Sequence, residues 1–92
     1  MSRLESSIEA MLVKRVKERG GKCIKLTGYV GIPDRLVLMP GGRITFVELK
    51  TEIGKLSEAQ IFWREELNSL GFSVKVINSL NNLEQFLDRR KK

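Results

Sequence analysis

A tight turn between two apolar segments constrains the fold of this chain more than any other feature of its sequence. The turn residues are Pro40-Gly41-Gly42, a strong signal for a reversal of the chain. The segment before it, 34–39, holds the apolar run LVLM, which is typical of an internal strand. The segment after it, 44–50, alternates in polarity as a half-buried strand does. We therefore predict a hairpin in which position 34 lies roughly opposite position 48.

The other segments predict helices and strands around this hairpin. An apolar stripe at helical spacing begins at Leu4, and Gly20-Gly21 ends that helix. Ser57 and Gln60 form a capping box at the start of a second helix. The predicted order is helix 4–19, strands 23–26, 34–39 and 44–50, helix 57–70, strand 72–77 and a short helix capped by Asn81. The chain is thus expected to be an α/β protein of order α-β-β-β-α-β-α, with residues 1–92 in one domain.

The composition excludes several kinds of chemistry. The chain has no histidine, so zinc sites of the Cys/His type, histidine general bases and serine triads are excluded. Cys23 is the single cysteine, and we interpret it as a small buried hydrophobic residue because no histidine could activate it. If the chain is an enzyme, its chemistry comes from carboxylates, lysine, hydroxyls or Tyr29.

The charge balance favours a polyanionic partner. There are 17 basic and 11 acidic residues, a formal net charge of +6, and nucleic acid is the commonest polyanion that such a chain binds. No apolar stretch approaches the ~18 residues needed to cross a bilayer, and the N-terminal segment lacks the pattern of a signal peptide. We expect a cytoplasmic protein without a membrane partner.

Two carboxylates and a lysine are expected to meet at one end of the hairpin. Glu48 and Lys50 lie two residues apart, so they share one face of their strand, and the register returns Asp34 close to Glu48. A Glu-x-Lys pair alone is an ordinary pair of opposite charges on a strand. On the first helix, Glu5 and Glu9 both lie on the apolar stripe, where a carboxylate needs a cation or a metal ion as partner. Such carboxylates suit Mg²⁺, and phosphodiester hydrolysis needs cations to offset the charge of its transition state.

The motif resembles that of the PD-(D/E)xK nuclease superfamily, with Pro33-Asp34, thirteen further residues and then Glu48-x-Lys50. More narrowly, the chain resembles the stand-alone VRR-NUC (virus-type replication-repair nuclease) domains of phages and bacteria. The segments that carry this likeness are Gly31–Leu36, Gly41–Arg43, Phe46–Lys50, Gly54–Ser57 with Gln60, and Gly71-Phe72. The resemblance covers nearly the whole chain.

The resemblance implies a restriction-endonuclease-like core, a mixed sheet flanked by helices. It also implies Mg²⁺- or Mn²⁺-dependent cleavage of DNA without an organic cofactor. Small stand-alone members are similar to Holliday junction resolvases, so it implies a homodimer that acts on branched DNA, in a bacterium or a phage-infected host cell. Carried over by motif, the metal ligands would be Asp34, Glu48, the Leu49 carbonyl and Glu9, with Glu5 as the alternative helix acid. Lys50 would be the catalytic lysine, and Gln60 would lie near the site.

Contacts to DNA phosphates are expected from several basic residues acting together, namely Lys25, Arg35, Arg43, Lys55 and Arg64. Two other interpretations stay open: a non-catalytic DNA-binding module of the same fold, and a subunit that docks a replication, repair or packaging enzyme. The presence of Asp34, Glu48 and Lys50 together favours a nuclease over both.

Overall fold

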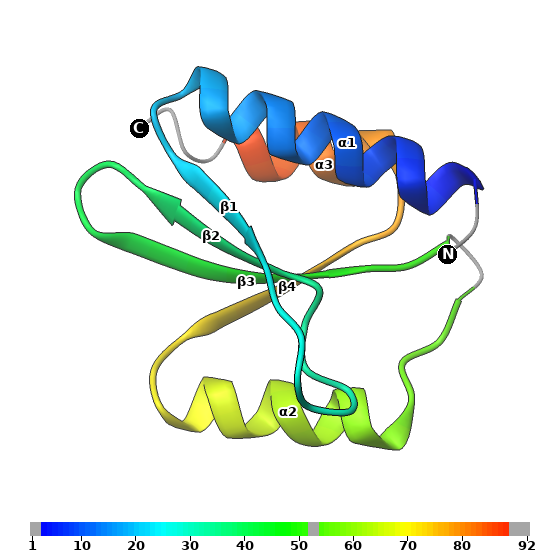
Figure 1. Cartoon of the computed structure of the whole chain (residues 1–92). Helices are drawn as coiled ribbons and strands as arrows, with labels where there is room; N and C mark the ends of the chain where they lie inside the picture. Colours follow the sequence, from blue (N-terminus) through cyan, green and yellow to red (C-terminus); the bar gives the residue numbers. More distant parts are fainter. Residues whose placement is uncertain (1–2, 52–53, 89–92) are drawn as a thin grey trace.

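Seven elements form a three-layer α/β structure (Figure 1). The computed structural model describes residues 3–51 and 54–88, and of residues 3–6 only the backbone. The elements are α1 (Arg3–Glu18), β1 (Lys22–Lys25), β2 (Arg35–Met39), β3 (Arg43–Leu49), α2 (Glu58–Ser69), β4 (Ser73–Ile77) and α3 (Leu80–Asp88). This is the predicted order α-β-β-β-α-β-α.

The four strands form one mixed sheet in the order β1-β2-β3-β4. The pairs β1/β2 and β2/β3 are antiparallel, and β3/β4 is parallel. In the β2/β3 hairpin, Arg35 lies opposite Val47 and Leu36 opposite Phe46. One step further along this register, position 34 meets position 48. The register predicted from the turn is therefore confirmed, as is the mixed sheet flanked by helices.

The hydrophobic core lies between the sheet and the layer formed by α1 and α3. Successive side chains of a strand face opposite sides, so alternate residues of β2 and β3 point toward these two helices. The buried core residues are Ile8, Leu12, Val16, Val37, Met39, Val47, Leu49, Ile77, Leu83, Phe86 and Leu87. Cys23 is half-buried and packs against this cluster, close to the prediction. No helix in the described ranges is long and apolar enough to cross a membrane.

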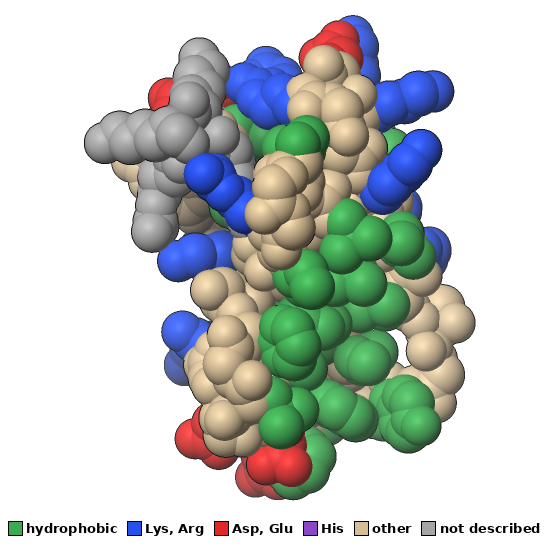
Figure 2. All heavy atoms as spheres, turned by 90° about the vertical axis from the view of Figure 1, so that its left-hand side faces the viewer, with side chains coloured by type: hydrophobic (Ala, Val, Ile, Leu, Met, Phe, Trp, Pro, Cys, Tyr) green, Lys and Arg blue, Asp and Glu red, His purple; other side chains and the backbone are tan. Residues whose placement is uncertain are grey.

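The other face of the sheet is covered only in part, by α2. Of the helix's own residues only Leu67 is buried. The predicted capping box fixes the start of α2, because the Gln60 N–H donates to Ser57 Oγ (3.2 Å) and the Ser57 N–H donates to Gln60 Oε1 (2.8 Å). Beyond α2, apolar side chains of the strands stay in view on the molecular surface (Figure 2).

The last helix begins earlier than predicted, and its cap is a different residue. The Asn82 N–H donates to Ser79 Oγ (3.1 Å), so Ser79 rather than Asn81 caps α3. Serine and asparagine cap helices about equally well, so the local sequence does not choose between them. Because α3 begins at Leu80, Ser79 occupies the cap position, and Asn78 and Asn81 on either side do not.

Candidate active site

The two central carboxylates lie on the α2 side of the β2/β3 hairpin. Asp34 follows Pro33 and directly precedes β2, and its Oδ2 accepts a hydrogen bond from the Leu49 N–H at 2.8 Å. Its own carbonyl accepts the Leu26 N–H at 3.0 Å, which holds this end of the hairpin against the segment after β1. Asp34 is thus tied to the residue that follows Glu48, as the predicted register requires.

Glu48 is buried, with only 4% of its surface exposed. A buried carboxylate is unfavourable unless it has hydrogen-bonding or charged partners. The Gln60 Nε2 supplies such a partner and donates to Glu48 Oε1 at 3.2 Å. Since the Gln60 Oε1 is held by the capping box, the start of α2 aims this amide at the carboxylate. A helix cap therefore doubles as a support for the candidate site.

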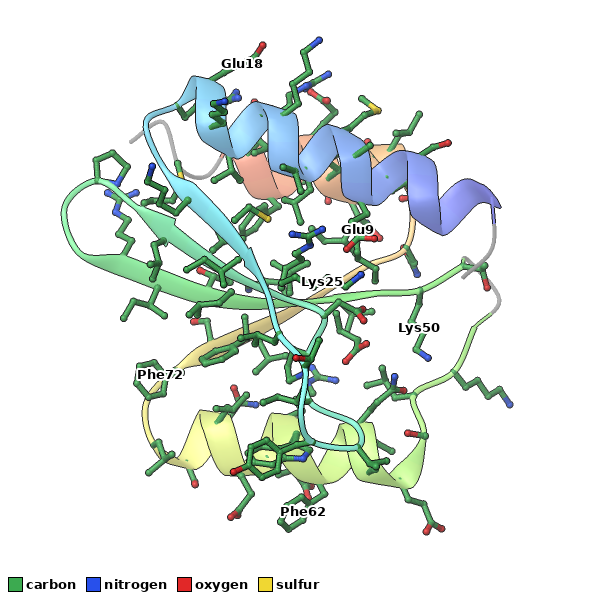
Figure 3. The ribbon with its side chains drawn as sticks, viewed as in Figure 1. Glu9, Glu18, Lys25, Lys50, Phe62 and Phe72 are labelled. Carbon is green, nitrogen blue, oxygen red and sulfur yellow. The ribbon has the colours of Figure 1, made fainter. Side chains whose placement is uncertain are left out.

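Lys50 lies just beyond the end of β3. Its N–H donates to the Ile77 carbonyl at 3.1 Å, which extends the parallel pairing to β4 and fixes the direction of the chain. Figure 3 shows its side chain pointing to the α2 side of the sheet, the side on which Glu48 lies. The structure thus brings Asp34, Glu48, Gln60 and Lys50 to one end of the sheet.

Glu9 lies on the other side of the sheet, under α1 (Figure 3). Its Oε2 accepts a hydrogen bond from Arg35 Nε at 2.8 Å, and both side chains are largely buried, at 12% and 17% exposed. Arg35 also donates to the Cys23 carbonyl at 3.3 Å. Glu9 is therefore held by a cation and not placed beside Asp34. The side chain of Glu5 lies outside the described residues.

The donor set suits a hard cation, although it is not a closed cluster. A carboxylate just before β2, another on β3, and the Leu49 carbonyl between Glu48 and Lys50 are oxygen ligands of the kind that Mg²⁺ and Mn²⁺ prefer. Among residues 7–51 and 54–88, no group of three or more Asp, Glu, Cys or His side chains could hold a metal ion. The arrangement fits an ion bound by two carboxylates that keeps several waters.

The five predicted DNA contacts are not equivalent. Lys25, Arg43, Lys55 and Arg64 are exposed, whereas Arg35 is committed to Glu9. Sequence reasoning missed this ion pair. Alternation along the chain places Arg35, the first residue of β2, on the opposite side from Asp34 and so toward the helix layer of Glu9, but it does not pair Arg35 with a particular acid.

Comparison with known proteins agrees with this fold. A solved structure described as a VRR_NUC domain superposes with a TM-score of 0.88 and 30% sequence identity, covering 95% of this chain and 97% of the other. The model of the VRR-NUC domain family matches residues 2–81. A protein of Acyrthosiphon pisum secondary endosymbiont phage 1, named "Putative nuclease p44", is 42% identical over 77 residues, which is 82% of this chain and 83% of the phage protein.

The fold and the carboxylate end of its hairpin therefore define a VRR-NUC-type α/β domain. The chain belongs to the VRR-NUC domain family, which makes it a candidate nuclease related to a phage protein. The resemblance inferred from the motif is confirmed.

Proposed function

We propose that this protein is a Mg²⁺- or Mn²⁺-dependent endonuclease that hydrolyses DNA phosphodiester bonds. The observation that carries the proposal is the convergence of Asp34 and Glu48 at one end of the β2/β3 hairpin, beside Gln60 and Lys50. Family membership and the phage relative named as a nuclease support the same activity.

In this proposal Asp34, Glu48 and the Leu49 carbonyl hold the ion. When bound, a divalent ion supplies positive charge to the phosphate and lowers the pKa of a bound water. Asp34 is oriented by the Leu49 N–H, and Glu48 is oriented by Gln60. Lys50 contacts a phosphate oxygen or orients the attacking water, because its side chain lies on the same side of the sheet as Glu48.

Glu9 is the first-helix acid of the proposal, although its carboxylate is paired with Arg35 on the other side of the sheet. The carboxylate has to leave Arg35 before it can contribute to the metal site, so metal binding on one side of the sheet would be coupled to this ion pair on the other. Arg35 then serves to hold Glu9, and phosphate contacts are left to the exposed residues Lys25, Arg43, Lys55 and Arg64.

The substrate we propose is branched DNA such as a Holliday junction, cut by a homodimer in the cytoplasm of a bacterium or a phage-infected host cell. A two-fold dimer presents two sites to two symmetry-related strands, which suits a four-way junction. The net charge of +6 supports binding to the phosphate backbone.

The test is a cleavage panel of single-stranded, duplex, flap and four-way DNA with Mg²⁺ or Mn²⁺. We expect preferential nicking of the four-way junction, reduced about 10²–10³-fold or more by Asp34→Asn or Lys50→Met. Glu65→Gln, in the second half of α2, and Lys14→Met, on α1, are the matched controls, since both change exposed residues away from the site. DNA binding without cleavage under all conditions would favour the non-catalytic module, and cleavage that survives both site variants would refute the assignment of the residues.

A further inference from the structure

The loop between β1 and β2, residues 26–34, presents two apolar side chains to water next to the candidate active site. Tyr29 is 66% exposed, and Val30 is 87% exposed. Tight turns are usually made from glycine, proline and short polar residues, each for a conformational reason, and none of these reasons calls for tyrosine followed by valine. The candidate active site as described above does not use these side chains either.

The conformation of this loop is fixed before any ligand binds. The Ile32 N–H donates to the Tyr29 carbonyl at 3.3 Å, and Gly31 has the positive φ, +84°, that the third residue of a type II turn requires. The Trp63 Nε1 donates to the Val30 carbonyl at 3.1 Å, and Gly31 lies so close to the backbone of α2 that a Cβ would not fit. Figure 1 shows the loop reaching from the sheet to α2. A surface held in this way loses little entropy when it binds a ligand.

Tyr29 forms the exposed end of an aromatic cluster. Its ring centroid lies 5.4 Å from that of Trp63 at an interplanar angle of 60°, and the Trp63 ring lies 5.9 Å from that of Phe62 at 81°. Edge contacts of this kind orient a ring. They leave about two thirds of Tyr29 in water, so the structure presents an oriented aromatic ring to a ligand.

Both ends of the loop meet at Asp34. The Leu26 N–H donates to the Asp34 carbonyl at 3.0 Å, while the Asp34 carboxylate accepts the Leu49 N–H at 2.8 Å. Tyr29 precedes Asp34 by five residues, which span at most about 18 Å even when fully extended. At about 3.4 Å for each base step along a strand, the ring lies within about five nucleotides of a phosphate bound at the carboxylates. The exposed Lys25, the last residue of β1, places a cation for a neighbouring phosphate where the loop begins.

The charges around the cluster favour a base over a phosphate as its ligand. Phe62 lies on the outer side of α2 (Figure 3), where its neighbours one helical turn away are the exposed Glu58 and Glu66. These carboxylates repel phosphate groups. A nucleobase is uncharged, and every base has a π face that stacks on an aromatic side chain. In an intact duplex both faces of a base are already stacked, so only an unpaired, unstacked base can reach the ring.

The size of the exposed surface also suits a single base. Tyr29 and Val30 together leave roughly 250 Å² of side chain in water, at about 150–200 Å² for a fully exposed side chain of this kind. One partner of a standard protein interface buries about 800 Å². The loop tip by itself is therefore too small for a protein partner.

We infer that Tyr29 and Val30 bind an unpaired base of the DNA substrate, which stacks on the Tyr29 ring and packs against Val30. The contact selects DNA with an unstacked base close to the phosphate that is cut, as at a branch point, a flap or a gap. This inference deepens the proposed function and rests on it for the DNA substrate. Tyr29 is a residue that determines specificity, and its contact is measured without metal, so no cleavage is needed.

The test uses a DNA duplex with one unpaired 2-aminopurine, a base analogue whose fluorescence depends on stacking, and the same duplex fully paired. Both are bound in EDTA. We expect Tyr29→Leu, which keeps an apolar side chain against Trp63, to weaken binding of the unpaired probe at least about fivefold and to leave binding of the paired duplex unchanged. The emission of the unpaired probe should change on binding to the wild type and to Tyr29→Phe, but not on binding to Tyr29→Leu. Phe72→Ala is the matched control, because Phe72 is an exposed aromatic residue at the other end of the sheet from Lys50 (Figure 3), and it should behave as the wild type.

Circular dichroism and the emission of Trp63, the one tryptophan of the chain, establish that each variant is folded with its loop on α2. Equal affinity and equal probe emission for the wild type and Tyr29→Leu would overturn the inference, as would an equal loss in Phe72→Ala. A Tyr29→Leu variant that binds DNA normally but sediments differently would assign the loop to a protein partner instead. Stacking as expected without any DNA cleavage would refute the proposed nuclease and leave this base site standing. Cleavage by a wild type whose binding does not depend on Tyr29 would do the reverse.

Discussion

The hydrogen bond between Gln60 and Glu48 makes a sharp prediction for the variant Gln60→Glu. The new carboxylate can still accept the Ser57 N–H, so the capping box is kept. It replaces the amide that donates to Glu48 at 3.2 Å with a second negative charge beside a carboxylate that is 4% exposed. The change therefore separates the role of Gln60 in the cap from its role at the candidate site.

The magnitude follows from the distance. Two unit charges 3.2 Å apart repel by about 5 kcal/mol at an effective dielectric constant of 20. Gln60 itself is only half-buried, so solvent screening reduces this, and we expect a loss of roughly 2–4 kcal/mol in the free energy of unfolding. Such a loss is a large part of the roughly 5–15 kcal/mol that stabilises a typical domain.

Urea unfolding followed by circular dichroism measures this loss, with Ser57→Ala as the control that removes the cap alone, at about 1 kcal/mol. The repulsion requires both carboxylates to be ionised. The destabilisation should therefore be complete at neutral pH and shrink as the pH falls and the pair takes up a proton. Mn²⁺ should also restore stability, because the ion would offset the added charge.

A loss in Gln60→Glu that equals that of Ser57→Ala and changes with neither pH nor Mn²⁺ would refute this reasoning. It would mean that the side chain of residue 60 does not contact Glu48 in solution. Cleavage activity is not needed for this readout, so the geometry is tested independently of the proposed function.

Three further predictions follow from particular contacts. Gly31→Ala should destabilise the fold by about 2 kcal/mol or more and lower cleavage, because Gly31 has φ +84° and the new Cβ would lie 2.5 Å from the backbone of α2. The control is Gly28→Ala, where φ is +102° but the space around the new Cβ is open; equal losses of stability for the two variants in urea unfolding would contradict the steric argument. Arg35→Met should lower the free energy of unfolding by roughly 2–4 kcal/mol, because it leaves Glu9 without its cation, and adding Glu9→Gln should recover much of that loss in the same assay. An Arg35→Met variant as stable as the wild type would show that the pair contributes nothing. Burial raises the pKa of the Cys23 thiol, so its alkylation by iodoacetamide should be slower in the folded protein than in urea and should increase only at higher pH; equal rates in both states would show that the thiol is accessible.

Local patterns in the sequence were sufficient to predict the elements and the hairpin. The turn at Pro40-Gly41-Gly42 and the alternation of β3 predict a register, and the structure has that register. The capping box of α2 was equally readable, since it depends on only Ser57 and Gln60, three residues apart. Contacts of this kind follow from backbone geometry over short distances.

Contacts between distant elements could not be predicted in the same way. The sequence pairs Glu9 with no particular residue, and only the packing of α1 on the sheet brings it to Arg35. The cap of α3 is Ser79 and not the predicted Asn81, because the end of β4 sets where the chain turns. The sequence likewise indicates which residues are apolar, but not that α2 leaves one side of the sheet open.

The sequence by itself thus determined the order of elements, the hairpin and its register, which sets Asp34 opposite Glu48, because short-range periodicity and turn chemistry act within a few residues. Tertiary structure alone decided which side of the sheet each charge occupies, which acid has a cation, and where apolar surface remains in water. The physical reason is that these outcomes depend on how helices far apart in the chain pack on the sheet, and a one-dimensional pattern of side chains does not contain those distances.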